Sequence, residues 1–328
     1  MGNTVNTIVQ NKSEILFLYD STYNIPNGDP FTGEQRYDEE TKKILISDVR
    51  IKRFIRDYLY EQKNGKSERL FEIYLLNDIS EASGRISGSA ARMKSLKKKY
   101  ENDASIKTDN NIDASKLLKK CIDVRLFGGI STEEKDAVDL TGPVQFALLN
   151  PSLNNVELRM HQNTSVFVSS TEKSRGAIGT TTIVPYAINQ IHGWINPFSA
   201  QYTNLTNDDI SIMFKALWDS INNSNTRTKS NQNSILLLKI NYSGQNKKLY
   251  GLDHLIKIKT KDKKEEQIRS INDYDFEFAD LVDKTNCDAI ESIHYYTELE
   301  AIDDILNDKP KFRKMSLTEF ILNGEVKK

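Results

Sequence analysis

The sequence predicts an α+β fold with a ferredoxin-like, RRM-like core that carries large insertions. Short apolar runs of strand length are interspersed with amphipathic segments of helical period. With the polar inserts set aside, their order is strand, helix, strand, strand, helix, strand, which is the ferredoxin-like arrangement that RNA recognition modules share. Two β-rich arms, at residues 166–168 and 181–188, flank a polar tip and predict a protruding β-hairpin. A fold of this kind does not by itself establish a function.

The chain has 328 residues, which is enough to bury a sizeable core as a single elaborated domain. We expect the core to be assembled from separate pieces of the chain, with an insertion, the hairpin tip and a charged C-terminal segment outside it. The expected boundaries are about 13–77, 141–168 and 180–242 for the core, 78–140 for a helical insertion, 169–179 for the tip and 249–328 for the C-terminal segment.

The first element is a nearly continuous apolar run at residues 14–19, which ends at Asp20. A run of this length with two aromatic residues is typical of a strand covered on both faces, so we expect it at the centre of the sheet. Prolines at both ends of residues 26–30 exclude regular structure there. Asn27-Gly28 between them is expected to supply the positive φ of a tight turn.

A helix is predicted to begin after Ser47, which is placed as its N-cap, with Asp48 in the first turn. One face is apolar and packs on the sheet, through Ile51, Phe54, Ile55, Tyr58 and Leu59. Four cations flank that face: Arg50, Lys52, Arg53 and Arg56. Cations beside a capped helix start, with free N–H groups close by, can hold a phosphate. The alternative is a solvated surface whose arginines make local ion pairs.

The later elements follow from the same periodicities. We predict strands at residues 70–77, 141–148 and 235–240, a Lys-rich helix late in 79–101, a helix from 114 into 123–129, and a helix capped by Thr206. Val144, Phe146 and Leu148 are expected to share one strand face. The glycines at 128, 129 and 142 are interpreted as turn residues rather than as points of backbone approach to a phosphate. In the tail, the pattern favours a strand near residues 290–295 and a last helix at 317–322.

Charge is unevenly distributed although the net charge is only −1. Residues 82–100 contain six cations and no carboxylate, whereas residues 273–308 contain twelve carboxylates and one lysine. A protein with such separated charges can bind a polyanion on one surface and present another surface to itself or to a basic partner.

Three stretches, residues 15–20, 27–30 and 47–59, together resemble the start of the CRISPR-associated Cas-seven family, closest to its type I-B members. Residues 123–129 and 141–146 are similar to further stretches of the same family. That family forms the repeated backbone subunit of the Cascade surveillance complex. The resemblance therefore implies a non-catalytic protein that binds CRISPR RNA (crRNA), lines up in many copies as a helical filament and presents the guide for pairing with target DNA, beside other Cascade subunits.

The resemblance also implies the residues that contact RNA. Those expected to hold the sugar-phosphate backbone are Asn27, Ser47, Arg50, Lys52, Arg53, Arg56 and Arg125. The hairpin corresponds to the family's thumb, so Lys173 and Arg175 are expected to contact phosphates and Ile178 to wedge against a base. A disordered surface loop is the alternative for this tip. The chain lacks the aromatic RNP signature, so RNA is expected to be held through its backbone and shape.

A metal-dependent ribonuclease is the first alternative function, because Asp20, Asp29, Asp38 and Asp48 could converge near the end of the first strand. Their spacing is not that of a metal motif, and Asx turns plus a helix cap account for them. The four histidines lie in separate segments. We therefore expect no catalysis, no metal and no cofactor. The second alternative is a protein of filament assembly alone.

Cys121 and Cys287 are the two cysteines, and their separation gives neither a disulfide framework nor a Cys-x-x-Cys metal site. Residues 1–13 lack an apolar signal segment, and no apolar run approaches the length needed to cross a membrane. We expect a protein of the bacterial or archaeal cytoplasm with no membrane partner.

Overall fold

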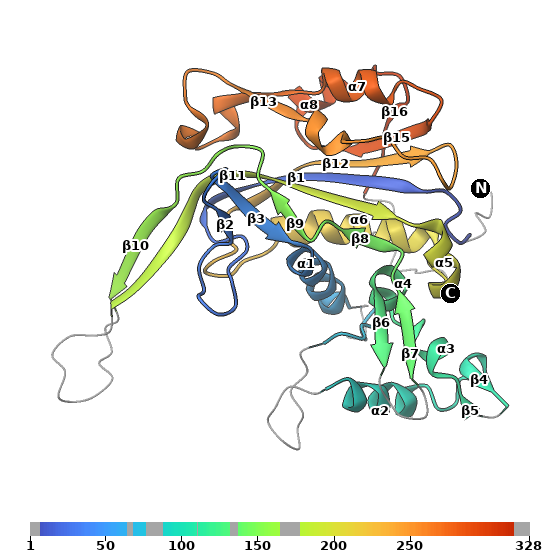
Figure 1. Cartoon of the computed structure of the whole chain (residues 1–328). Helices are drawn as coiled ribbons and strands as arrows, with labels where there is room; N and C mark the ends of the chain where they lie inside the picture. Colours follow the sequence, from blue (N-terminus) through green and yellow to red (C-terminus); the bar gives the residue numbers. More distant parts are fainter. Residues whose placement is uncertain are drawn as a thin grey trace, which may run out of the picture.

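The computed structural model describes residues 7–63, 68–76, 88–109, 111–131, 137–164 and 178–317. Within them, a seven-stranded sheet has helices on one face and the C-terminal segment on the other (Figure 1). The strands of this sheet are β1 Ser13–Asn24, β8 Val144–Phe146, β10 Arg159–Thr164, β11 Ile178–Ile195, β12 Gln232–Tyr242, β15 Ile290–Tyr296 and β16 Phe312–Lys314.

The centre of the sheet has the predicted order of elements, with α1 (Asp48–Glu61) after β1 and α6 (Asn207–Asn222) after β11. β11 pairs antiparallel with both β1 and β8, and β1 pairs antiparallel with β12. β1 and β8 therefore run parallel on either side of β11, while β11 and β12 run parallel on either side of β1. Each strand–helix–strand unit is thus split by a strand of the other unit, which is the ferredoxin-like arrangement.

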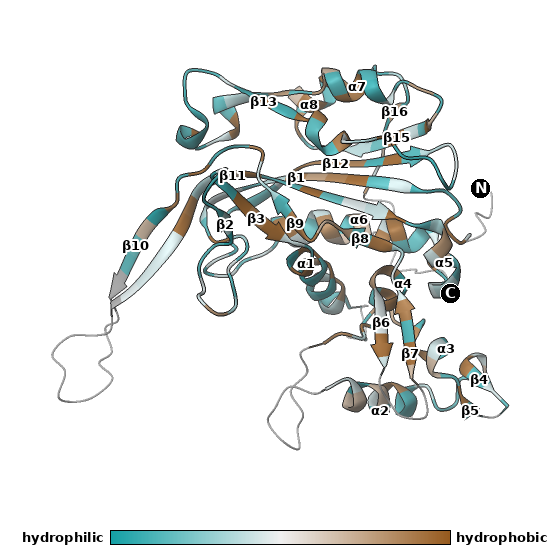
Figure 2. Cartoon of the chain, in the orientation of Figure 1, coloured by the Kyte–Doolittle hydropathy of each residue, from teal (hydrophilic) through white to brown (hydrophobic). Residues whose placement is uncertain are grey.

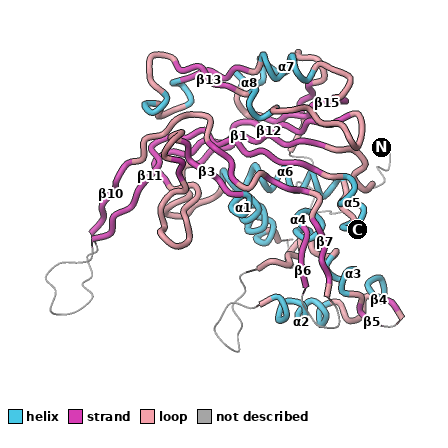
Figure 3. The backbone as a smooth tube through the Cα atoms, viewed as in Figure 1, coloured by secondary structure: helices cyan, strands magenta, loops and turns pink. Residues whose placement is uncertain are grey.

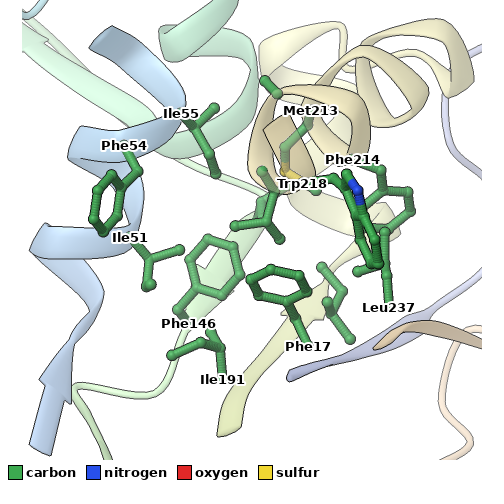
Figure 4. Close-up of a cluster of buried hydrophobic side chains, with 14 of the residues drawn as sticks. Phe17, Ile51, Phe54, Ile55, Phe146, Ile191, Met213, Phe214, Trp218 and Leu237 are labelled. Carbon is green, nitrogen blue, oxygen red and sulfur yellow. The ribbon is translucent and has the colours of Figure 1, made fainter. Parts of the chain in front are cut away.

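β1 is buried on both faces, as its continuous apolar run predicts. Ile15, Phe17 and Tyr19 pack toward α1 and α6, whereas Leu16 and Leu18 pack toward the C-terminal segment. Figure 4 shows Phe17 between Phe146 and Trp218 in the core on the helical face. In Figure 2, β1 is hydrophobic over much of its length at the middle of the sheet. The prediction of a central strand is confirmed.

The C-terminal segment covers the second face of the sheet. Phe278, Leu281 and Ile302 lie in the same apolar cluster as Leu16 and Leu18. The elements of this segment are η2 Leu252–Leu255, β13 Lys257–Thr260, η3 Glu265–Gln267, η4 Ile271–Asp273, β14 Tyr274–Glu277, α7 Ala279–Thr285 and α8 Glu300–Leu306, together with β15 and β16. RNA recognition modules stack bases on one face of their sheet. Here polypeptide fills that face, so RNA cannot bind in that manner.

Both core helices begin at the predicted caps. The Ser47 hydroxyl accepts a hydrogen bond from the Arg50 N–H at 3.4 Å. Thr206 and Asp209 form a capping box, in which each side chain accepts from the other residue's backbone N–H. These side chains satisfy N–H groups that have no partner inside the helix. The predicted helix starts are confirmed.

β10 and the start of β11 form a hairpin that extends away from the rest of the molecule (Figure 1). Its register runs from Arg159 opposite Ile183 to Thr164 opposite Ile178. The predicted arm at residues 181–188 lies within β11. The predicted arm at 166–168, Lys173 and Arg175 lie outside the described residues. The protruding hairpin itself is confirmed.

The described residues between 88 and 141 form a group of short elements around their own apolar cluster, which includes Met93, Leu96, Leu117 and Leu118. We call them the 88–141 group. The tube in Figure 3 shows this group hanging below the helical face of the sheet. Its elements are α2 Ser89–Lys99, η1 Ala104–Ile106, β4 Lys107–Thr108, β5 Asn111–Ile112, α3 Ala114–Leu118, α4 Ile122–Phe127, β6 Gly128–Ser131 and β7 Val138–Thr141. The exact division of the chain into core, insertion and tail stays a prediction.

Residues 70–76 do not form the predicted strand. The backbone N–H groups of Tyr74 and Leu75 donate to the Asp123 carboxylate, at 2.8 and 3.0 Å, instead of to a neighbouring strand. The Glu72 carbonyl accepts from the Ile122 N–H at 3.0 Å. A buried carboxylate has replaced a strand ladder as the partner of this backbone.

Three other local predictions are wrong in detail. The positive φ expected at Gly28 occurs instead at Gly33, with φ 74°. The helix expected from residue 114 into 123–129 is two helices, because the N–H groups of Lys120 and Cys121 bond to carbonyls three residues back and end α3. Leu148 does not share a buried face with Val144 and Phe146 but is 76 % exposed, because β8 ends at Phe146.

Other predictions for these segments hold. α4 ends at Gly128, whose φ of 81° favours glycine. The strand expected near residues 290–295 is β15, while the helix expected at 317–322 falls almost wholly outside the described residues. Of the helices that the structure describes, none has the length and apolar composition needed to cross a membrane.

Candidate nucleic-acid interface

A pocket of about 500 Å³ opens at the N-terminus of α1. A small sheet positions it, built from β2 (Tyr37–Asp38), β3 (Lys43–Ser47) and β9 (Leu149–Pro151). β3 runs directly into α1, and β9 pairs alongside β3 up to the helix start. The pocket is lined by Asn27, Gly28, Pro30, Arg36, Ser47, Asp48, Val49, Arg50, Arg53, Leu148 and Leu149. Four of the nine residues predicted to contact the sugar-phosphate backbone therefore lie together: Asn27, Ser47, Arg50 and Arg53.

Asn27 and Ser47 shape the pocket through hydrogen bonds to each other. Asn27 Oδ1 accepts from the Ser47 N–H at 2.6 Å and from the Ser47 hydroxyl at 2.8 Å. The same hydroxyl accepts from the Arg50 N–H, and the Asn27 N–H donates to Gln35 Oε1 at 2.9 Å. These contacts hold the turn against the helix start. They also leave the Ser47 hydroxyl engaged both as donor and as acceptor.

Arg50 is the cation of the pocket without an anionic partner in the described residues. Its guanidinium carbon lies 3.7 Å from the centre of the Phe54 ring, and its Nε has no hydrogen-bond partner there. Burial lowers the pKa of Arg50, and Tyr19 and the carboxylate of Asp57 act in the opposite direction without forming an ion pair with it. Burial, together with Arg50, also lowers the pKa of Lys229 to about 8. A bound anion would relieve this uncompensated positive charge.

Arg53 and Arg36 lie at the rim and have exposed or partly exposed partners. Arg53 Nε is 2.7 Å from Asp57, one helical turn further, and both side chains are about half exposed. Arg36 pairs with Asp29 at 3.1 Å. Exposed pairs of this kind contribute roughly 0–1 kcal/mol, so a phosphate can compete for either guanidinium.

Sequence reasoning missed Arg36. Its backbone is tied to both sides of the pocket, since its N–H donates to the Asn27 carbonyl at 3.0 Å and its carbonyl accepts from the Leu45 N–H at 2.8 Å. Only this pairing brings the residue to the helix start. An arginine shortly after a Pro-Asn-Gly-Asp-Pro turn was the signal available, and it is weak.

The apolar wall of the pocket was also missed. Val49, Leu148 and Leu149 are among the exposed large hydrophobic residues of the chain, and all three line this pocket. The Asp48 N–H donates to the Leu148 carbonyl at 3.2 Å, which fixes the wall beside the first turn of the helix. Apolar surface next to guanidinium groups suits a nucleotide, which has both a phosphate and flat or aliphatic faces.

Lys52, Arg56 and Arg125 do not line this pocket. Lys52 lies 3.0 Å from Asp48, Arg56 lies 3.0 Å from Asp123, and Arg125 makes two hydrogen bonds with Asp209 at 2.6 and 2.9 Å. Asp123 and Asp209 are buried, so the two arginines compensate buried negative charge. RNA contacts from these three residues stay predictions. Lys173 and Arg175, as stated, are not described.

The four aspartates weighed as a metal site do not meet. Asp20 is buried and accepts from Asn233 and Tyr186, at 2.8 and 3.0 Å, and burial raises its pKa. Asp29 and Asp38 accept from backbone N–H groups two and three residues later, as Asx turns do. In the part of the chain that the structure describes, no three His, Cys, Asp or Glu side chains are grouped to hold a metal.

Comparison with known proteins decides the family. The family model described as CRISPR-associated protein Cas7 matches residues 11–279. The chain belongs to the Cas7 family. A CRISPR-associated protein Cas7 from Haloferax volcanii is 30 % identical over 309 residues, which cover 87 % of this chain and 86 % of that protein. The family resemblance carried by residues 15–59 and by the later stretches is confirmed.

The fold of this Cas7 protein is also similar to that of a solved chain. A chain of a "CRISPR RNA-guided surveillance complex, pre-nicking" aligns with a TM-score of 0.50 at 10 % identity, over 93 % of this chain and 97 % of that chain. At that identity the likeness concerns the fold. It shows that the α+β architecture described above occurs in a subunit of such a complex.

Proposed function

We propose that this Cas7 protein is a non-catalytic, crRNA-binding backbone subunit of a type I, I-B-like CRISPR surveillance complex. Several copies would bind in succession along one guide RNA and leave its bases accessible to a target DNA strand, beside other subunits of the complex. Family membership supports the proposal, and so does the pocket at the start of α1. The single observation that carries it is Arg50, a partly buried guanidinium that lines the pocket without an anionic partner among the described residues.

The pocket can hold a sugar-phosphate backbone without reading its bases. Arg50 would receive a phosphate from inside the pocket, and Arg36 and Arg53 would exchange their exposed carboxylates for the same or the next phosphate. Val49, Leu148 and Leu149 offer an apolar surface to a ribose or to the face of a base. Since the Ser47 hydroxyl and Asn27 Oδ1 are already engaged, these groups add no readout of sequence.

The hairpin of β10 and β11 would act as the thumb over the bound guide. Lys173 and Arg175, which follow β10 along the chain, are proposed to contact phosphates of the guide. We also propose the domain division given above, with one elaborated core, a helical insertion and a charged C-terminal segment, and a location in the cytoplasm, where crRNA is present.

Filter binding tests the assignment with two single-stranded RNAs of unrelated sequence. Arg50→Ala/Arg53→Ala should weaken both RNAs equally, by roughly tenfold or more, and should reduce the slope of log affinity against log salt by about one to two. Lys94→Ala/Lys98→Ala is the matched control, because both lysines are exposed on α2 and do not line the pocket. Unchanged affinity and salt slope in the Arg50/Arg53 variant would refute the proposed site.

The absence of catalysis needs a separate test. Labelled RNA incubated with the wild-type protein and magnesium should remain intact. Cleavage that Asp29→Ala abolishes would establish the ribonuclease alternative instead.

A further inference from the structure

A second cavity, of about 580 Å³, lies between the 88–141 group and the N-terminus of α6. We call it the α3–α6 cavity. It is lined by Ser105, Ile106, Lys116, Lys119, Lys120, Arg125, Asn204, Thr206 and Asp209. It shares no lining residue with the pocket at α1.

The lining holds four cations and one carboxylate. That carboxylate, Asp209, is fully used, since Arg125 bonds both its oxygens and the Thr206 N–H donates to one of them. Lys119 has no ion pair or hydrogen bond from its side chain to any described residue. Lys116 donates to neutral oxygens of Lys107 and Thr108, at 3.3 and 3.0 Å. Lys120 is paired with Asp103 at 2.8 Å. Lys116 and Lys119 are therefore the cations of the lining that have no anionic partner among the described residues.

Two neutral residues, Asn204 and Thr206, also line the cavity. Asn204 is the left-handed C-cap of α5 (Pro197–Thr203), with φ 60°. Thr206 lies at the N-terminus of α6, a helix of 16 residues whose dipole is positive at this end. The capping box with Asp209 already occupies this helix start, so the capacity of the cavity for an anion rests on Lys116 and Lys119. Two ammonium groups without an anionic partner, on one cavity, suit a phosphate.

Exposed aromatic side chains lie on the helix that leads into the cavity. Phe198 and Tyr202 on α5 are 50 % and 71 % exposed, and they lie one helical turn apart on the same face. Tyr202 precedes Asn204 by two residues. A positively charged groove with neighbouring aromatic faces is how proteins hold single-stranded nucleic acid, with phosphates on the cations and bases stacked on the rings.

We propose that the α3–α6 cavity is a second phosphate site, which binds the backbone of a single-stranded nucleic acid while a neighbouring base stacks on Tyr202. In Figure 1, α3 and α5 lie on the side of the molecule opposite the β10–β11 hairpin. A strand in this cavity is therefore a different segment from one held beneath the hairpin. The inference does not depend on the function proposed for the α1 pocket.

Fluorescence anisotropy tests the site with labelled oligo-U and oligo-dT of about twelve nucleotides, on nuclease-treated protein. Lys116→Glu/Lys119→Glu should weaken binding about tenfold and lower the salt slope by about two. Lys94→Glu/Lys98→Glu makes the same change of charge on α2, away from the cavity, and should weaken binding less than about threefold. Lys116→Gln/Lys119→Gln changes the charge by half as much and should give an intermediate loss of affinity. Thermal unfolding of each variant shows whether it is folded.

The aromatic contribution is tested separately. Tyr202→Ala should weaken binding about fivefold or more, while Tyr202→Phe should retain it, because stacking needs the ring and not the hydroxyl. Poly-glutamate of matched charge should compete poorly. Equal competition by poly-glutamate, with no effect of Tyr202→Ala, would overturn the nucleic-acid assignment in favour of a general anion site.

Comparing the variants of the two sites in the same binding assay shows which of the two proposed sites binds nucleic acid. If one strand occupies both sites at once, the losses from Lys116→Glu/Lys119→Glu and from Arg50→Ala/Arg53→Ala should add in free energy, because the sites share no residues. A loss confined to the Arg50/Arg53 variant would overturn the α3–α6 site and leave the proposed function standing. A loss confined to the cavity variant would support the second site and refute the first.

Discussion

Helix geometry places the four cations of α1 on opposite flanks of its apolar face. At about 100° per residue, Arg50 and Arg53 lie on one side of the stripe, while Lys52 and Arg56 lie on the other. The first flank borders the pocket, and the second faces Phe127 and Asp123. From residue type alone, the four cations were equally good candidates for binding a phosphate. In the folded protein, Arg50 has no ion-pair partner among the described residues, whereas Arg56 is paired with the buried Asp123 carboxylate.

Arg56→Ala should act mainly on stability. It would leave the buried Asp123 carboxylate without its ion pair, at 3.0 Å in the wild type, and should lower the free energy of unfolding by roughly 3 kcal/mol. Arg53→Ala removes a half-exposed ion pair and should change the free energy of unfolding by less than about 0.5 kcal/mol. Urea denaturation of both variants measures the difference. Equal stabilities would contradict the structural role of Arg56.

His192 makes stability depend on alkaline pH. Burial alone would lower its pKa, but hydrogen bonds with Asp253 and Glu14, at 3.4 and 2.6 Å, outweigh burial and raise the pKa to about 9. Trp194 packs against the ring, and the Tyr242 hydroxyl donates to the same Glu14. Because the folded pKa exceeds the unfolded value of about 6.5, the stabilisation is complete below pH 6.5 and is lost as pH rises through 9.

The free energy of unfolding of the wild type should therefore fall between pH 7 and pH 10, by of the order of 2–3 kcal/mol more than that of His192→Gln. Chemical denaturation across this range, with both proteins in the same buffers, measures it. Parallel pH profiles would show that the imidazolium does not stabilise the fold.

At the scale of elements, close backbone crossings decide where the 88–141 group joins the core. Gly142 lies against the chain at the end of α4, so that a Cβ built on it would be 2.0 Å from the Phe127 carbonyl carbon and 2.4 Å from the Gly128 N. A Cβ at Gly128 would lie 2.1 Å from the Leu140 carbonyl oxygen. These glycines allow two backbones to touch each other. The interpretation as a turn residue holds for Gly128, the C-cap of α4 with φ 81°, whereas Gly142 is required by the backbone crossing and not by a turn.

Gly142→Ala should push the two backbones apart and destabilise the fold by more than about 2 kcal/mol, since the clashing atoms belong to main chain that cannot rotate away. Gly179→Ala is the matched control, because nothing lies within 4 Å of a Cβ at that position. Thermal unfolding compares them. If the midpoint temperature of unfolding were the same for Gly142→Ala and Gly179→Ala, the two backbone segments would be able to move apart without loss of stability.

For the whole molecule, the important fact is that both faces of the sheet are covered. Among the described residues, α1 and α6 bury one face, and the acidic C-terminal segment buries the other, so neither face of the sheet is open to a nucleic acid. The carboxylate-rich residues 273–308 belong to the segment that covers the sheet, and they line neither the pocket at α1 nor the α3–α6 cavity.

If copies bind in succession along a guide, the mass of the complex should rise in equal steps as the RNA is lengthened. Sedimentation with a graded series of RNAs measures those steps at moderate salt. Arg50→Ala/Arg53→Ala should shorten the assembly on each RNA, since each copy has lost backbone contacts. Oligomers of unchanged mass without RNA would instead support the alternative of a protein of filament assembly alone.

The sequence by itself determined the elements whose periodicity and caps are local. The apolar run of β1, the Ser47 and Thr206 caps and the order of core elements were all readable, because burial and capping leave a pattern within a few residues. The family was readable too, from the stretch that includes the turn and α1. The local sequence pattern could not show which of the cations has an ion-pair partner in the folded protein.

Only the tertiary structure decided that Arg56 and Arg125 neutralise the buried Asp123 and Asp209, that Arg36 joins the pocket, and that residues 70–76 bond to a carboxylate instead of forming a strand. Each of these depends on a contact between residues far apart in the chain. Such a contact is set by how the elements pack. The sequence gives the charge of each side chain, but its ion-pair partner is brought next to it only when the chain folds.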